Sequence, residues 1–396
     1  MRVKVHGELM VPEDPRGGIV NGDISYTSSS GLELIQCYGV AIKSDTYDYF
    51  CERVSPDNGR TWLEPRLQFV SRREGDCVVR YGGFTYFLDP VEDRLVRLYG
   101  VGRYPGDNPI LALWDVQCQV YDRSERDWGE PVSVSEEVLE KQPSAFERGA
   151  LMISRSSPIR TSRGLMLVPC QLKAVRGGRV WFPFPHYFSP FYESAVLIGR
   201  WRGSSLEWEL SEVVTIDPSV SCRLCEPTVV ELRDGKVLMI MRGDNGAFPD
   251  RPGYKWFSVS EDGGYTWSEP QPLRYTDGEP LYSPSSCSYA FRSEKTGKVY
   301  WVANILDRNP VGNRPRYPLQ IVELDEEEIA VKRETMVVID DRRPGDSPAV
   351  QLSNFSCYQD RETGDLVLVM ARYGERGDCP DLILRSPLYL YRVELD

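Results

Sequence analysis

Histidine is scarce in this sequence, which has only His6 and His186 among its 396 residues. This scarcity excludes chemistry that needs several imidazoles, such as a zinc site with paired histidine ligands. Basic residues are also in deficit, because 47 Lys and Arg stand against 59 Asp and Glu and give a net charge of −12. Nucleic acids and anionic membrane surfaces bind basic faces, so we expect neither as a partner.

Long apolar runs are absent as well. No segment reaches the ~18 apolar residues of a membrane span, and no apolar stretch follows the basic start of the chain. We therefore expect a cytoplasmic protein if Met1 is the natural start, and a secreted or periplasmic one if a signal peptide has been removed. The ten cysteines are scattered, which favours buried thiols over a disulfide framework. Cys222 and Cys225 have the spacing of half a zinc site, but no second pair follows, so we expect no metal and no cofactor.

Aromatic and turn-forming residues are abundant. The chain holds 22 Tyr, 9 Trp and 13 Phe beside 33 Gly and 29 Pro, with 41% hydrophobic and 27% charged residues overall. This composition is typical of a folded globular protein built from short strands and frequent turns.

An octapeptide occurs twice. The segments 55–62 and 260–267 share the pattern Ser-x-Asp-x-Gly-x-Thr-Trp, and Glu-Pro follows each copy within three residues. In such a segment the Asp accepts main-chain hydrogen bonds, the Gly supplies a positive φ and the Trp covers a neighbouring strand. We interpret the repeat as a hairpin turn with a folding role.

A longer repeat consists of an apolar strand, a glycine turn and a second apolar strand. Its six copies, one every 66 residues, lie at 23–35, 77–98, 157–168, 226–240, 286–301 and 355–368. Such hairpins predict an all-β protein, a propeller of six four-stranded antiparallel blades, with residues 1–396 in one domain. We expect the first strand, Val3–Val11, to pair with the last, Leu388–Leu395, and residues 133–147 to hold one short helix or a loop.

These repeats resemble the sialidase superfamily, whose six-bladed propellers carry Asp-box repeats of this octapeptide form. The resemblance implies that Glu226, in Cys222-Arg-Leu-Cys-Glu226-Pro, corresponds to the glutamate that assists the nucleophile. It implies that Arg242 is one arginine of the triad that binds a carboxylate. Arg316 corresponds to the third arginine of the triad, with Arg314 as the alternative, and Arg223 is a further substrate-binding candidate.

The family's catalytic acid is an aspartate ahead of the first octapeptide, where this chain has Asp45 and Asp48. Two features of the family are missing. The first triad arginine has no counterpart in the segment 19–25, and the nucleophilic tyrosine is replaced by Phe355, with Tyr358 three residues later as the nearest candidate. These departures argue against strict sialidase activity.

The leading hypothesis is therefore a sialidase-like glycoside hydrolase that acts on an oligosaccharide or polysaccharide with an acidic or modified group. Glu226 and Asp45 would act as acid and base, and the arginines would hold the anionic group. One alternative is a polysaccharide lyase with His186 or a tyrosine as the base. The other is a propeller that binds a glycan or a protein without catalysis, since many unrelated functions share one fold. The sequence does not indicate an oligomeric state.

Overall fold

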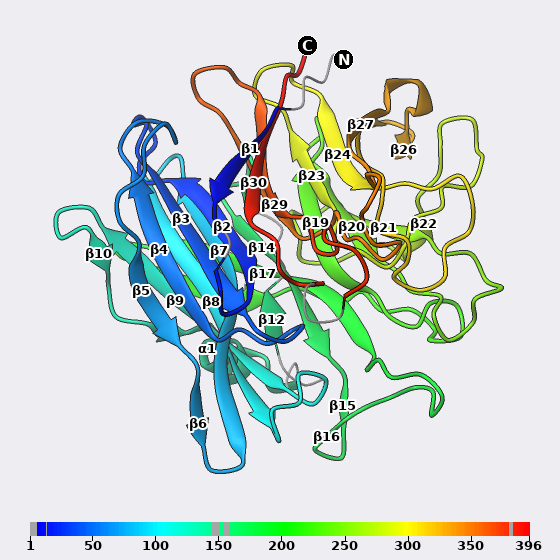
Figure 1. Cartoon of the computed structure of the whole chain (residues 1–396), viewed down its shortest axis with the longest axis horizontal. Helices are drawn as coiled ribbons and strands as arrows, with labels where there is room; N and C mark the ends of the chain where they lie inside the picture. The colour runs from blue at the N-terminus through cyan, green and yellow to red at the C-terminus, as the bar shows by residue number, and fades with distance from the viewer. Residues whose placement is uncertain (1–5, 13, 145–150, 154–157, 380–382) are drawn as a thin grey trace.

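Six antiparallel sheets surround one axis in the computed structural model, which describes residues 6–12, 14–144, 151–153, 158–379 and 383–396 (Figure 1). The all-β six-bladed propeller predicted from the hairpin repeats is confirmed. The helix α1 (Val134–Lys141) lies in the segment for which we expected a helix or a loop. Residues 3–5, 145–147 and 157 of the expected elements lie outside the described part of the chain.

The first three blades follow one another along the chain. Blade 1 consists of β2 (Gly18–Tyr26), β3 (Leu34–Ala41), β4 (Tyr49–Ser55) and β5 (Arg66–Val70). Blade 2 consists of β6 (Arg72–Glu74), β7 (Cys77–Asp89), β8 (Arg94–Pro105), β9 (Leu113–Asp122), β10 (Asp127–Trp128) and β11 (Val132–Ser133). Blade 3 consists of β12 (Leu151–Ile153), β13 (Ile159–Arg160), β14 (Met166–Lys173), β17 (Tyr192–Arg202) and β18 (Ser205–Leu210). The strands β15 (Val175–Arg176) and β16 (Arg179–Val180) form a separate ribbon.

The remaining blades complete the ring. Blade 4 consists of β19 (Cys225–Glu231), β20 (Val237–Arg242), β21 (Lys255–Ser260) and β22 (Gln271–Pro272). Blade 5 consists of β23 (Tyr289–Arg292), β24 (Val299–Asn304), β25 (Leu319–Asp325), β26 (Ala330–Val331) and β27 (Val337–Asp340), with a 3₁₀ turn at Arg333–Thr335. Blade 6 consists of β28 (Phe355–Gln359), β29 (Leu366–Ala371), β30 (Leu388–Val393) and the N-terminal strand β1 (His6–Val11).

The two ends of the chain meet in blade 6. β1 pairs antiparallel with β30, so that Gly7 lies opposite Tyr391 and Val11 opposite Leu388. Figure 1 shows β1 beside β30, at the outer edge of this blade. The predicted pairing of the first and last strands is confirmed, and it closes the ring.

The core consists of apolar clusters between neighbouring blades. Leu98 of blade 2 packs in one cluster with Leu172 of blade 3, and Ile240 of blade 4 packs in another with Trp301 of blade 5. Every residue of β29 is buried, because a blade covers its neighbours with both faces. The apolar groups therefore lie between the sheets, and the strand ends near the axis are available for polar residues.

The two octapeptides form turns between the third and fourth strands of blades 1 and 4. Asp57 accepts hydrogen bonds from the main-chain N–H and the hydroxyl of Thr61, both at 2.7 Å. Asp262 accepts the same two bonds from Thr266, at 3.0 and 2.7 Å. Trp267 packs against the cluster between blades 3 and 4, as expected for a residue that joins neighbouring blades.

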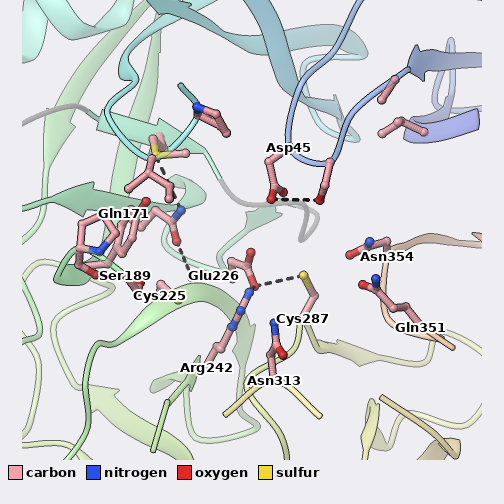
Figure 2. Close-up of a pocket in the computed structure, with 18 of the residues that line it drawn as sticks. Asp45, Gln171, Ser189, Cys225, Glu226, Arg242, Cys287, Asn313, Gln351 and Asn354 are labelled. Atoms are coloured by element: carbon pink, nitrogen blue, oxygen red, sulfur yellow. Dashed lines mark hydrogen bonds and ion pairs between the residues drawn. The ribbon is translucent and has the colours of Figure 1, made fainter. Parts of the chain in front are cut away.

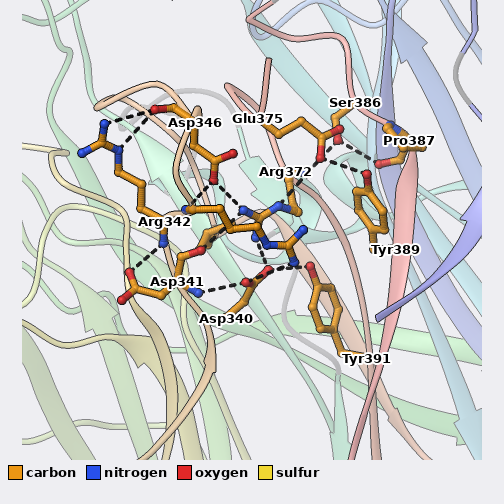
Figure 3. Close-up of polar contacts among 12 residues, drawn as sticks. Asp340, Asp341, Arg342, Asp346, Arg372, Glu375, Ser386, Pro387, Tyr389 and Tyr391 are labelled. Carbon is orange, nitrogen blue, oxygen red and sulfur yellow. Dashed lines mark hydrogen bonds and ion pairs between the residues drawn. The ribbon is translucent and has the colours of Figure 1, made fainter. Parts of the chain in front are cut away.

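Blades 5 and 6 are also joined by charged groups around the fully buried Arg372 (Figure 3). Its guanidinium forms ion pairs with Asp340 at the end of β27 and with Asp346 at 2.6 Å. Tyr391 of β30 donates to Asp340 at 2.7 Å. The Asp340 and Asp346 carboxylates compensate the buried charge, and the contacts fix the loop that leads from blade 5 into blade 6.

Replacing Asp262 with Ala should destabilise the fold. Burial raises the pKa of Asp262, but the bonds from Thr266 and Ser260 outweigh it and hold the pKa at about 2. Loss of these bonds leaves turn amides without partners, so we expect the free energy of unfolding to fall by about 1–3 kcal/mol in urea denaturation. The control is Glu261→Ala, which removes a side chain that is 81% exposed. Equal stability of the two variants would contradict this account.

Candidate functional site

A cavity of about 390 Å³ opens where strand ends from all six blades meet (Figure 2). Its wall includes the following residues, in blade order: Gly18 and Asp45, Tyr104 and Trp114, Gln171 and Lys173, Glu226 and Arg242, Cys287 and Arg316, and Asn354 and Tyr373. Several of them share one structural position, since Tyr104, Lys173 and Arg242 lie at or next to the ends of β8, β14 and β20. Equivalent strands of different blades end at the same side of the ring, and residues far apart in the sequence therefore line one cavity.

Glu226 reaches the cavity through an irregularity in β19. The pairing of β19 with β20 shifts register between Cys225 and Thr228, and Glu226 has a φ of 44°. Such a backbone is unfavourable for a residue with a side chain and persists where its surroundings hold it. Gln171 of blade 3 supports it, because its side-chain oxygen accepts the Glu226 N–H at 2.7 Å.

Glu226 and Arg242 form the central ion pair. Arg242 Nη1 lies 2.5 Å from Glu226 Oε2, and the two side chains are 11% and 26% exposed. Ser285 Oγ accepts from Arg242 Nε at 2.8 Å, and the Cys287 thiol donates to Glu226 Oε2 at 3.1 Å. Burial raises the pKa of Glu226, but the charge and hydrogen bond of Arg242, the Cys287 bond and the charge of Arg316 bring it down to about 2. Glu226 is therefore an anion in the cavity wall and is unable to act as a proton donor near neutral pH.

Arg316 and Arg314 are held by neutral groups. Arg316, which is 8% exposed, donates to Gln351 at 2.9 Å, to Ser353 at 3.3 Å and to the Asn313 carbonyl at 3.1 Å. Arg314 donates to the carbonyl of Ala349. Neither arginine forms an ion pair within the described residues. Burial and the nearby charge of Arg242 lower the pKa of Arg316 to about 10. Both guanidinium groups remain charged at neutral pH, so this side of the cavity is electropositive.

Arg223 also lines the cavity, but its charge is already compensated. It forms an ion pair with Asp244, whose side chain is fully buried, and Tyr187 donates to the same carboxylate at 2.8 Å. Burial lowers the pKa of Arg223, while Asp244 raises it above its usual range. This arrangement indicates that Arg223 holds the loop of residues 187–189 and that its charge is not available to a ligand.

Asp45 faces the cavity from the blade opposite Glu226. It lies in the loop between β3 and β4 and is exposed, and Ser44 Oγ donates to its carboxylate at 3.2 Å. Tyr104 holds the loop by donating to the main-chain carbonyl of Asp45 at 3.2 Å. The second aspartate of this loop, Asp48, pairs instead with Arg80 at 3.2 Å and does not line the cavity.

Tyr358 and His186 are not part of the cavity wall. Tyr358 is 7% exposed and packs edge-on against Tyr26, with ring centroids 5.8 Å apart, between blades 6 and 1. β28 directs this side chain into the seam between the blades, so its position gives no support to the predicted catalytic role. His186 is exposed in a loop and packs against Phe184. The predicted role of His186 in substrate binding has no support from its position.

The part of the wall formed by blades 2 and 3 is aromatic, which the sequence analysis did not anticipate. Trp114 of β9 lies on three glycines of β7 and β8, since a Cβ at Gly100, Gly102 or Gly82 would lie 2.6, 3.0 or 3.2 Å from its indole. Glycine weakens a strand and is used where another group approaches the backbone closely. The indole is therefore a fixed flat surface at the cavity, and Tyr104 packs edge-on against it.

Within the residues that the structure describes, no three His, Cys, Asp or Glu side chains are grouped as ligands of one metal ion. Cys222 is buried and accepts a hydrogen bond from the Ala247 N–H at 3.4 Å, and all ten cysteines are outside disulfide bonds. Across the same described ranges, no helix has the length and apolar character needed to span a bilayer.

Comparison with known proteins finds similarity in structure only. No protein-family model and no curated protein matches the sequence. A Hadza microbial sialidase matches with a TM-score of 0.66 and 14% identity, over 98% of this chain and 68% of its own. The intramolecular trans-sialidase from Ruminococcus gnavus matches with a TM-score of 0.66 and 12% identity, over 98% and 97% of the two chains. A protein of unknown function from Dyadobacter fermentans matches with a TM-score of 0.66 and 14% identity, over 100% and 99%.

These similarities show that the chain has the propeller fold found in sialidases and trans-sialidases. At 12–14% identity they assign neither a substrate nor a catalytic residue.

The Glu226–Arg242 ion pair should make a pH-dependent contribution to stability. The pKa of Glu226 falls from 4.5 in the unfolded chain to about 2 in the folded protein. The contribution is therefore fully present above pH 4.5 and is lost as the pH falls through about 2. We expect Glu226→Gln to lower the free energy of unfolding by about 2 kcal/mol at neutral pH, because Arg242 stays charged without its carboxylate. Denaturation curves of both proteins should converge in acid; a constant difference at every pH would contradict the assignment.

Proposed function

We propose that this protein is a glycosidase that cleaves a glycosidic bond in an acidic or otherwise modified glycan bound in the cavity. The observation that carries the proposal is the position of Arg316 and Arg314 beside the Glu226–Arg242 pair, without carboxylate partners of their own among the described residues. Planar, permanently charged guanidinium groups suit a carboxylate or sulfate. The net charge of −12 does not oppose this, because a local arginine cluster sets the potential inside a cavity.

The two carboxylates differ in a way that separates their roles. Glu226 is ionised and bound to Arg242, so it stabilises the positive charge that develops on the sugar ring. Asp45 is exposed and forms no ion pair in the described structure, so its carboxyl group is accessible to a bound glycan. We assign it the role of the general acid that protonates the leaving oxygen. Two such groups support hydrolysis without a nucleophilic tyrosine. Asp45 protonates the leaving oxygen, water attacks the sugar carbon, and the Asp45 carboxylate then takes up the proton that the water loses.

The aromatic side of the cavity would bind the sugar ring. A flat indole held against glycine backbone stacks on the apolar face of a pyranose with little loss of side-chain entropy. In this arrangement Trp114 holds the ring, and Arg316 holds its charged substituent. Asp45, which lies in the loop held by Tyr104, is close to the bond between two sugars.

A polysaccharide lyase is the second candidate function. The form of this hypothesis that uses His186 loses its basis, because that side chain is outside the cavity. Tyr192 and Tyr373 do line the cavity, and a tyrosine near arginines is suited to removing a proton beside a uronate carboxylate. Glycans with carboxylate or sulfate groups, incubated with the protein, distinguish the candidates. A lyase forms an unsaturated product that absorbs ultraviolet light, and a hydrolase forms only new reducing ends. Saturable binding without either product would favour a binding protein.

Replacing Arg316 with Met should weaken substrate binding. Loss of a forked, charged donor costs about 1.5–3 kcal/mol, so we expect KM to rise about 10- to 100-fold while kcat changes little. Arg316→Lys should recover only part of the loss, since an ammonium group does not form the forked contact. The control is Arg308→Met, which removes an exposed arginine outside the cavity. A KM unchanged in the Arg316 variants would remove this residue from the anion site.

Replacing Asp45 with Asn should impair the chemical step. A positioned general acid accelerates proton transfer about 10²- to 10⁴-fold, so kcat should fall within that range while KM stays near the wild-type value. Asp48→Asn is the matched control from the same loop, because Asp48 binds Arg80 and does not line the cavity. We expect it to lower the melting temperature and leave kcat almost unchanged. A drop in kcat with Asp48→Asn but not with Asp45→Asn would exchange the two assignments.

A further inference from the structure

Lys255 is buried behind the Glu226–Arg242 pair. It is the first residue of β21, it is 0% exposed, and it lies directly opposite Arg242 in the pairing of β20 with β21. Its ammonium group donates to the main-chain carbonyls of Pro284, at 3.1 Å, and of Ser286. Within the described residues it forms no ion pair. Burial of an ammonium group without a counter-charge costs free energy. We therefore expect its two hydrogen bonds to hold the main chain at Pro284 and Ser286 in place.

The segment that Lys255 holds is the one that contacts the central pair. The carbonyls of residues 284 and 286 accept from Lys255, while the side chains of the alternate residues 285 and 287 contact the site. Ser285 Oγ accepts from Arg242 Nε at 2.8 Å, and the Cys287 thiol donates to Glu226 Oε2 at 3.1 Å. One ammonium group is thus connected to both members of the ion pair through four consecutive residues.

A second buried lysine makes the same kind of contact on another part of the wall. Lys173, at the end of β14, is 1% exposed and donates to the carbonyls of Ile110 at 3.0 Å and Ala112 at 2.6 Å. Burial lowers the pKa of Lys173 to about 8, and burial together with the charge of Arg242 lowers the pKa of Lys255 to about 7. Each lysine thus donates to two alternate carbonyls in a loop of a neighbouring blade. Of the two, Lys255 is the one whose loop contacts Glu226 and Arg242, through Cys287 and Ser285.

We infer that Lys255 is a positioning residue, which keeps Ser285 and Cys287 against Arg242 and Glu226 by holding the carbonyls of Pro284 and Ser286. The geometry of the ion pair then depends on a group that contacts neither the cavity nor a ligand. The effect of Lys255 on turnover rests on the proposed function, whereas its effect on the position of residues 284–287 does not.

The test uses the Cys287 thiol as a reporter of the segment. Iodoacetamide labelling of the folded protein, followed by peptide mass spectrometry, gives the rate at Cys287, and the exposed Cys379 is an internal reference. Lys255→Met removes the donor and retains an unbranched side chain. We expect labelling of Cys287 to accelerate at least fivefold, because a released segment no longer holds the thiol on Glu226, while labelling of Cys379 stays constant.

Lys173→Met is the matched control, since it removes an equally buried lysine from another blade. It should leave the Cys287 rate within about twofold of the wild type. Lys255→Gln retains one donor group and should give an intermediate rate, which keeps the test available if Lys255→Met does not fold. An unchanged Cys287 rate in the folded Lys255 variants would overturn the inference. Equal acceleration of Cys287 labelling by Lys173→Met would also overturn it, because the effect would then reflect a general loosening of the fold.

Kinetics provide a second measurement. If the proposed glycosidase activity is found, Lys255→Met should lower kcat about 10- to 100-fold with a smaller change in KM, because a misplaced ion pair affects the transition state more than binding. An unchanged kcat together with accelerated labelling would overturn the link from segment to ion pair. If the wild-type protein turns over no glycan, the proposed function fails, and the labelling rates still decide whether Lys255 holds the segment.

Discussion

The structure depends on one packing constraint: each blade must bury both faces against its neighbours. The apolar clusters between blades satisfy it, including the one that joins Leu98 to Leu172 and the one that joins Ile240 to Trp301. An open arc would expose two apolar faces, so the ring has to close, and β1 closes it by adding to β30. Since the apolar contacts lie between the sheets, the strand ends at the axis carry polar and charged groups without weakening the core.

The electrostatics of the cavity follow from which charges are compensated. Arg242 is paired with Glu226 and Arg223 with Asp244, and these contacts organise the wall. Among the described residues, Arg316 donates to amide, hydroxyl and carbonyl oxygens alone, which fix its direction and leave its charge uncompensated. An acidic protein thus contains a local positive site. Within the part of the chain that the structure describes, Arg316 has no carboxylate partner, and this uncompensated charge indicates that the cavity would take an anionic ligand.

The fold and part of the site were predictable because repeats carry them. Glu226 and Arg242 lie together because β19 and β20 form one hairpin, in which Cys225 is opposite Arg242. The resemblance indicated Arg316. Tyr358 was misplaced because alignment along one strand does not say which face of that strand lies on a neighbouring blade. Lys255 was missed because its role depends on carbonyls of another blade, a contact with no local sequence pattern. The recurrence of strand ends at the cavity is a usable signal for Tyr104, Lys173 and Arg242, at or next to the ends of β8, β14 and β20. It does not indicate Lys255, which begins β21.

Ring closure by β1 has a consequence for the timing of biosynthesis. β1 leaves the ribosome long before its partner β30, which begins at Leu388. It must wait while roughly 380 residues are added, which takes about 20 to 80 s at cellular elongation rates. During that interval the blades between them can stack in order, but the ring stays open at one seam. The last blade to assemble is therefore built from segments that are synthesised before and after the five other blades.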